Sequence, residues 1–267
     1  MSGQRTGAIV LRQLYLFQGS PARILPLFGW VAIDVVLWGF ITRYLNSFKS
    51  SGYNFVPALL GAVLLWDFFT RVMQGVTTAF FEDVWSRNFL NVFATPLLIS
   101  EYIAGLVLAS IWTSMIGLIV MLVLAKVFFG LSFLSYGILL IPFLLVLFLC
   151  GIALGILASA MVLRLGPAAE WLVWPLPAML SPFAGVFYPL STLPQWMQWI
   201  GRALPPSYVF EGMRAIIAGR GVPRLDLLIG TSLAVFYLAL SCWFFARVYQ
   251  HVVRTGLIAR YSAETLS

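Results

Sequence analysis

Charged side chains are scarce in this sequence. Only 9% of its 267 residues are Asp, Glu, Lys or Arg, and 61% are hydrophobic, whereas about 25% of residues are charged in a typical soluble domain. This composition excludes an ordinary soluble domain and indicates an integral membrane protein. Because the apolar runs are long and do not alternate strictly, membrane-spanning helices are favoured over a β-barrel.

Groups that bind metals or perform catalysis are also few. The single histidine, His251, has no second histidine or cysteine nearby in sequence to complete a zinc or haem site. Cys150 and Cys242 lie inside apolar runs and are interpreted as small core residues. No GxxxxGK[ST] segment occurs, so the chain lacks a phosphate-binding loop. We therefore predict no cofactor or metal bound by this chain and no enzymatic activity of its own.

Basic residues outnumber acidic ones, which gives a formal net charge of +7. Since no soluble basic domain presents this charge, contact with anionic membrane lipid is favoured over binding to nucleic acid. The positive-inside rule divides the basic residues almost evenly, but the two tails favour a cytoplasmic location. We expect a multi-pass protein of the inner (plasma) membrane with both termini in the cytoplasm.

Six apolar segments are long enough to cross a hydrocarbon core, which needs about 20 helical residues. They cover residues 26–45, 56–80, 102–129, 136–163, 169–188 and 225–248. Residues 1–24 mix apolar and basic side chains, which predicts a helix lying on the membrane surface. The sequence thus predicts one all-α membrane domain over residues 1–267, with six transmembrane helices and an N-terminal interfacial helix.

The segment from residue 81 to 93 interrupts the apolar runs and predicts a short amphipathic helix. Its expected apolar face is Phe81, Trp85, Phe89 and Phe93, and its polar residues include Glu82, Asp83 and Arg87. Asp83 and Arg87 are four residues apart and could form an ion pair. Exposed aromatic residues on such a helix would suit insertion into a groove of a partner. Contact with lipid or with neighbouring spans is the alternative.

Residues 190–218 are too polar for a full span and too apolar for a solvated loop. They predict two short re-entrant helices before the last span. Trp196 and Trp199 would lie at the headgroup boundary. Glu211 and Arg214 are three residues apart, a spacing that allows an ion pair on one helix face.

Charges within the predicted spans are candidates for a translocation pathway, because each is costly in a bilayer and usually faces protein or water. Asp67 and Arg71 are four apart and could simply neutralise each other. Asp34, one turn from Trp38, has no partner in its own helix. We expect Asp34 to lie near Arg71 or to line a cavity between two copies of the chain.

The predicted fifth span contains three prolines, each of which removes a helix hydrogen bond. A kinked helix of this kind either lines a cavity or is a bent packing helix. Leu180, Phe183 and Phe187 are the candidate pathway residues on it. The GxxxG pair Gly151 and Gly155 permits close helix packing, either within one protomer or between two.

The order of these parts resembles the ABC type-2 transporter permease family, the membrane subunits of ABC exporters. The matching motifs are Ala94-Thr95-Pro96-Leu97 with Glu101 and Gly105, and Leu204-Pro205-Pro206 with Tyr208, Glu211 and Arg214. The resemblance covers essentially the whole chain. It implies a homodimer that binds two copies of a separate ATPase through a coupling helix at residues 81–93. ATP and Mg²⁺ would then be bound by that partner.

Two classes of function remain. The first is the permease subunit of an ATP-driven exporter, which moves a hydrophobic or amphiphilic substrate such as a drug, a lipid or a lipid-linked glycan out of the cytoplasm. The second is a membrane scaffold or assembly protein, or a membrane-integral enzyme. Only the first requires that the segment at residues 81–93 bind an ATPase.

Overall fold

The computed structural model describes residues 2–19, 21–47, 56–86, 89–93, 95–131, 137–138, 140–221 and 224–257. Every regular element within these ranges is a helix. The longer helices are α1 (Gly3–Gln18), α2 (Pro21–Ser47), α3 (Gly61–Trp85), α5 (Ile99–Phe129), α6 (Leu140–Leu165), α10 (Pro205–Ile217) and α11 (Arg224–Arg254). The all-α prediction is therefore confirmed over the described residues.

Four helices of the described residues are long and apolar enough to cross a membrane. They are Ala58–Trp85, Ile99–Phe129, Leu140–Leu165 and Arg224–Arg254. These correspond to the predicted second, third, fourth and sixth spans. Helix α2 occupies the predicted first span with 27 residues but is not one of these four. The total of six spans stays a prediction.

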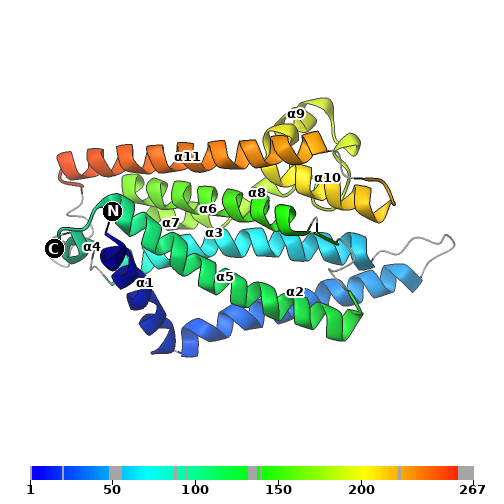
Figure 1. The fold of residues 1–267 in the computed structure, drawn as a ribbon, viewed down its shortest axis with the longest axis horizontal. Coiled ribbons are helices and arrows are strands. Elements are labelled where there is room, and N and C mark those ends of the chain that lie inside the picture. The colour runs from blue at the N-terminus through cyan, green and yellow to red at the C-terminus, as the bar shows by residue number, and fades with distance from the viewer. Residues whose placement is uncertain are drawn as a thin grey trace.

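The long helices run side by side along the long axis of the molecule (Figure 1). Packing links α11 to α6, α6 to α3, α3 to α5 and α5 to α2. Helix α3 is central, since 17 of its 25 residues are buried, compared with 6 of 31 in α11. Figure 1 shows α1, α4 (Phe89–Phe93) and the end of α11 at one end, and α9 (Gln195–Ala203) and α10 at the other. We call these the α4 end and the α10 end.

Glycines allow α6 to approach α3 closely. A Cβ atom on Gly151 would lie 2.9 Å from the backbone oxygen of Phe69, and one on Gly155 would lie 2.8 Å from the Cβ of Val76. Such separations are shorter than real side-chain contacts, so only glycine fits at these two positions without a shift. The GxxxG pair thus packs within one protomer.

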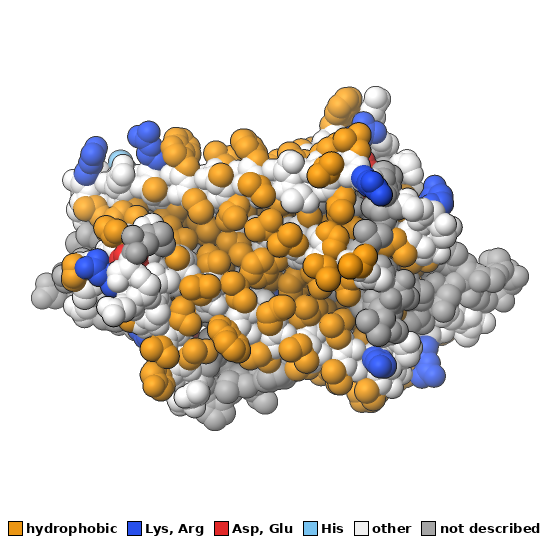
Figure 2. Space-filling view, in the orientation of Figure 1, with side chains coloured by type: hydrophobic (Ala, Val, Ile, Leu, Met, Phe, Trp, Pro, Cys, Tyr) orange, Lys and Arg blue, Asp and Glu red, His pale blue; other side chains and the backbone are white. Residues whose placement is uncertain are grey.

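The surface matches a membrane environment. Figure 2 shows hydrophobic side chains spread over the middle of the visible face, whereas Lys and Arg side chains gather toward the two ends. Exposed apolar residues on the long helices include Val123 and Phe128 of α5 and Phe236 of α11. A broad exposed apolar surface of this kind is costly in water and suited to lipid.

The prediction of one helix over residues 81–93 is wrong. The second apolar segment begins as a π-helix, η1 (Val56–Leu60), and continues through α3 to Trp85. A separate short helix, α4, follows at Phe89–Phe93. Residues 81–85 are therefore the last turns of the central helix. The expected apolar face therefore does not form on one helix: Phe81 lies on α3 and packs against Trp174, whereas Phe89 lies on α4 and packs against Tyr102 of α5.

The predicted fifth span is not a continuous helix. It consists of η3 (Pro167–Ala169), α7 (Glu170–Val173) and α8 (Leu176–Leu180), and residues 181–188 form turns and bends. The break falls at Trp174 and Pro175, because a proline ring clashes with the carbonyl of the preceding turn. The kink that the prolines predicted is thus a full interruption.

Helices are present in the predicted interfacial segment, residues 1–24, and in the predicted re-entrant segment, residues 190–218, but their bounds differ from the prediction. Helix α1 ends at Gln18 and α2 begins at Pro21, so the interfacial segment is shorter than the predicted 1–24. Residues 190–218 contain η4 (Leu190–Thr192), α9 and α10. Their insertion into the membrane as a re-entrant pair stays a prediction.

Candidate functional site

A cavity of about 730 Å³ lies along α3. Its lining on α3 extends from Asp67 to Trp85, and the remaining lining residues come from α1, α2, α5 and the residue after α7. Eighteen helical residues correspond to about 27 Å. The cavity therefore reaches from the α4 end of the bundle to its middle.

The inner part of the cavity holds the three charges that the sequence singled out. Asp34, Asp67 and Arg71 all line it. The predicted ion pair is present, with 2.7 Å between Arg71 Nε and Asp67 Oδ2. The hypothesis that Asp34 lies near Arg71 agrees with this shared cavity. In the described part of the chain, no hydrogen bond or ion pair is made by the Asp34 side chain.

The outer part of the cavity is bounded by two indole rings. Trp85, at the end of α3, and Trp174, at the break after α7, both line it. The Nε1 atom of Trp85 donates to Glu170 Oε2 at 2.8 Å, and Trp174 Nε1 donates to Glu170 Oε1 at 3.4 Å. Phe81 packs against both indoles. These contacts join the end of the central helix to the interrupted fifth segment.

A buried carboxylate near the cavity fixes α1 to the bundle. Asp83 is fully buried, forms an ion pair with Arg12 of α1, and accepts a hydrogen bond of 2.7 Å from Tyr102 Oη of α5. Burial lowers the pKa of Arg12, but the hydrogen bond and charge of Asp83 outweigh it and raise that pKa above its ordinary value. The predicted partner, Arg87, lies outside the described residues; the described partners of Asp83 come from α1 and α5.

A second buried carboxylate reinforces the same contact. Glu101, 1% exposed, accepts hydrogen bonds from the backbone nitrogens of Ser2 at 2.6 Å and Leu98 at 3.1 Å. Arg5 Nη1 lies 3.6 Å from the Glu101 carboxylate. Gly105 accommodates Ile9 of α1, because a Cβ atom there would meet Ile9 at 2.6 Å. Helix α1 is therefore held by charge and by close packing.

The predicted aromatic face at the α4 end is largely internal. Phe81 is 1% exposed, and Phe89 is fully buried against Phe80 and Tyr102. Glu82 is also buried, whereas Trp85 is 53% exposed. The side chains of Arg87 and Phe93 lie outside the described residues. The expectation of exposed aromatic rings is thus wrong at Phe81 and Phe89, because Phe81 packs against Trp174 and Phe89 packs between Phe80 and Tyr102.

The exposed surface at this end comes from the segment after α4. Thr95 and Pro96 are exposed, and Leu98 has 53% of its surface exposed. Leu98 directly precedes α5, and its backbone is fixed by Glu101. An apolar side chain is therefore presented on a rigid support at the α4 end.

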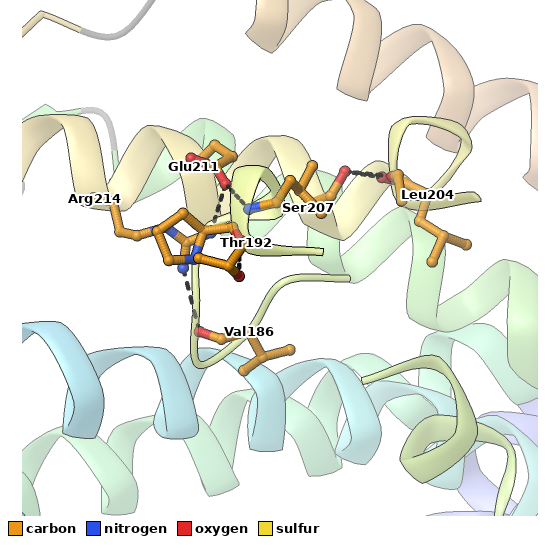
Figure 3. Close-up of polar contacts among 9 residues, drawn as sticks. Val186, Thr192, Leu204, Ser207, Glu211 and Arg214 are labelled. Atoms are coloured by element: carbon orange, nitrogen blue, oxygen red, sulfur yellow. Dashed lines mark hydrogen bonds and ion pairs between the residues drawn. The ribbon is translucent and has the colours of Figure 1, made fainter. Parts of the chain in front are cut away.

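The α10 end contains a second polar cluster (Figure 3). Glu211 Oε1 accepts hydrogen bonds from Leu190 N at 2.7 Å and from Arg214 Nη2 at 3.0 Å. The predicted pairing of Glu211 with Arg214 is present. Arg214 Nη1 also donates to the backbone oxygen of Val186 at 3.4 Å. Helix α10 is thereby joined to the turns that follow α8.

The remaining predicted pathway residues do not line the cavity. Trp38 stacks on Phe187, with 5.5 Å between ring centroids and 15° between planes, although 149 positions separate them. Phe183 packs on Trp196 of α9 at 6.3 Å. Leu180 ends α8. These side chains connect the interrupted fifth segment to α2 and α9.

Sequence reasoning did not find several polar residues of the cavity. Gln13 and Ser114 are each 1% exposed and line it. Thr113 does so from the next position on α5. The sequence did contain one indication of such residues, namely a polar residue on the packed face of an otherwise apolar helix. Gln13 is an example, because it lies one helical turn after the buried Ile9. Among the described residues, no group of three or more His, Cys, Asp or Glu could hold a metal ion.

Comparison with known protein families identifies the family of this chain. The family model described as "ABC-2 type transporter" matches residues 6–218, which is most of the chain. No curated protein matches the chain. The chain belongs to the ABC-2 type transporter family, and it is a multi-pass membrane protein of the ABC permease class. Membership of this family implies an ABC ATPase as partner in general.

Proposed function

We propose that this chain is the permease subunit of an ATP-driven exporter that moves a hydrophobic or amphiphilic substrate out of the cytoplasm. The observation that carries the proposal is the cavity along α3, which joins polar groups in the middle of the bundle to the α4 end. A cavity of this size is in the range of sites for small organic ligands. Family membership supports the transport role.

The α4 end is the proposed ATPase-binding surface, and two copies of a separate ATPase bind a homodimer of this chain. The chain lacks a phosphate-binding loop, so ATP and Mg²⁺ are bound by the partner and this chain is not itself an enzyme. The exposed Leu98, with Thr95 and Pro96, offers an apolar contact on a rigid support. Because Trp85 and Glu170 bridge α3 and α7, movement at this end is transmitted to the cavity.

The α4 end faces the cytoplasm in this proposal, since the ATPase is there. Helix α1 and the end of α11 lie at the same end (Figure 1), which supports the proposal that both are on the cytoplasmic side of the inner (plasma) membrane. A substrate would then enter the cavity from the cytoplasmic half of the bundle. The α10 end, with its Glu211–Arg214 cluster, would face outward.

The test is to purify the tagged chain in mild detergent from its native host and to identify its partners by mass spectrometry. We expect an ABC ATPase at one copy per chain, and we expect Leu98→Asp to remove it by placing a charge in an apolar contact. Leu225→Asp is the matched control, because Leu225 is also exposed, at 66%, but begins α11 at the opposite end. Loss of the ATPase from both variants, or from neither, would contradict docking at the α4 end. Recovery of an intact complex without any ATPase would favour a scaffold or an enzyme.

A further inference from the structure

We propose that the cavity along α3 binds an organic cation, an amphiphile that carries an ammonium group. This inference rests on the proposed function and deepens it, because it names a substrate class for the same cavity. It is carried by the charge of the lining, by two buried polar atoms without partners and by the indole rings that also line the cavity.

The cavity has the opposite sign of charge to the chain as a whole. Among the described residues, Asp34, Asp67 and Glu82 are its acidic lining residues and Arg71 is its one basic lining residue. The chain overall carries 16 basic and 9 acidic residues. A negative cavity in a basic protein is not a consequence of composition. Its field favours cationic ligands over anionic ones.

Asp34 is the carboxylate that is available to a ligand. Asp67 is already neutralised by Arg71, with a second contact of 3.4 Å between Arg71 Nη2 and Asp67 Oδ1. Asp34 is half-buried, and the described part of the chain supplies it with neither a hydrogen bond nor an ion pair. An acidic residue inside a span is costly and is typically retained for a function.

Buried polar atoms supply a second, independent indication of a ligand. Gln13 Oε1 and Ser114 Oγ have no hydrogen-bond partner, although both residues are 1% exposed and line the cavity. Unsatisfied buried polar groups are rare and call for an explanation. The oxygen of Gln13 can only accept, so it requires a donor. Gln13 Nε2 bonds the Ala79 backbone oxygen at 3.3 Å, so this oxygen lies in the outer part of the cavity, where a donor on the organic body of the ligand would meet it.

Indole rings complete the site. Trp30, one helical turn before Asp34, lines the inner part of the cavity, whereas Trp85 and Trp174 line its outer part; the three are partly exposed, at 63%, 53% and 38%. The face of tryptophan is the strongest aromatic partner for a cation, and its ring also packs against apolar groups. The lining therefore matches a ligand with a cationic group and an organic body.

The experiment compares two probes that share the dansyl body and differ at one amine, which is charged in the first and acetylated in the second. Monodansylcadaverine carries a primary ammonium group, and its N-acetyl derivative is neutral. The purified full chain is placed in phosphatidylcholine nanodiscs without ATPase, and binding is followed by energy transfer from tryptophan to dansyl, with empty nanodiscs as baseline. We expect saturable binding of the amine and affinity about tenfold lower for the acetylated probe, since the ionic hydrogen bonds are lost.

Asp34→Asn should lower the affinity for the amine by about tenfold and leave the acetylated probe unaffected. The matched control is Asp226→Asn, an acidic residue in the first turn of α11 outside the cavity, which should change neither. Equal binding of both probes by the unmodified protein, or no saturable binding, overturns the proposal without any variant. No ATPase is present in this binding experiment, so its result does not depend on the test of the permease role. If the ATPase is recovered with the chain but no cation binds, only the proposed cation site is refuted.

Discussion

Replacing Asp83 by asparagine should weaken the contact between α1 and the bundle. The Asp83 side chain is fully buried, pairs with Arg12, and accepts a hydrogen bond from Tyr102. Asparagine removes the negative charge and turns an amide NH₂ group toward one of two donors. Hydrogen bonds to charged groups contribute about 1.5–3 kcal/mol net. Since the Arg12 side chain is 28% exposed and keeps part of its hydration, we expect a loss of about 2 kcal/mol in the free energy of unfolding.

A double-mutant cycle isolates the pair. Asp83→Asn, Arg12→Gln and the double variant would be unfolded reversibly in mixed micelles of mild detergent and sodium dodecyl sulfate, followed by tryptophan fluorescence. The coupling between the two positions should be about 1 kcal/mol or more, because they are in direct contact. Additivity within about 0.5 kcal/mol would refute the reasoning. It would show that α1 is held by apolar packing, as between Ile9 and Gly105, and not by this charge pair.

Two further variants test other contacts by the same unfolding measurement. Gly155→Ala should lower the free energy of unfolding by about 1–3 kcal/mol, because the added methyl group overpacks against Val76. The control is Gly7→Ala on α1, where a Cβ atom would meet nothing within 4 Å, so this change should be neutral or slightly stabilising. Equal effects of the two changes would show that α6 and α3 can move apart freely. Glu211→Gln should lower the free energy of unfolding by about 1 kcal/mol, because the ion pair with Arg214 is lost while a side-chain oxygen remains to accept from Leu190 N. An unchanged free energy of unfolding would mean that water replaces the ion pair.

The positions of the long helices follow from the sequence because length and apolar composition decide whether a segment can cross a bilayer. The local ion pairs follow for a similar reason: Asp67 with Arg71, and Glu211 with Arg214, lie on one helix face at fixed spacing. In such cases the helix geometry alone brings the partners together.

Contacts between distant segments could not be predicted in this way. The pairing of Asp83 with Arg12 depends on how α1 crosses α3, and the stacking of Trp38 on Phe187 depends on where the fifth segment breaks. The apolar spacing at Phe81 and Phe89 indicated an apolar face, and both side chains are buried, although on two different helices. It could not tell whether a partner protein or the chain's own helices would cover it.

The central claim is that this chain works as the membrane half of an ATP-driven exporter. The most direct measurement is the intact mass of the complex purified from the native host in mild detergent, by native mass spectrometry. The account predicts two copies of this chain with two copies of an ABC ATPase. A stable assembly of this chain that contains no ATPase would contradict it.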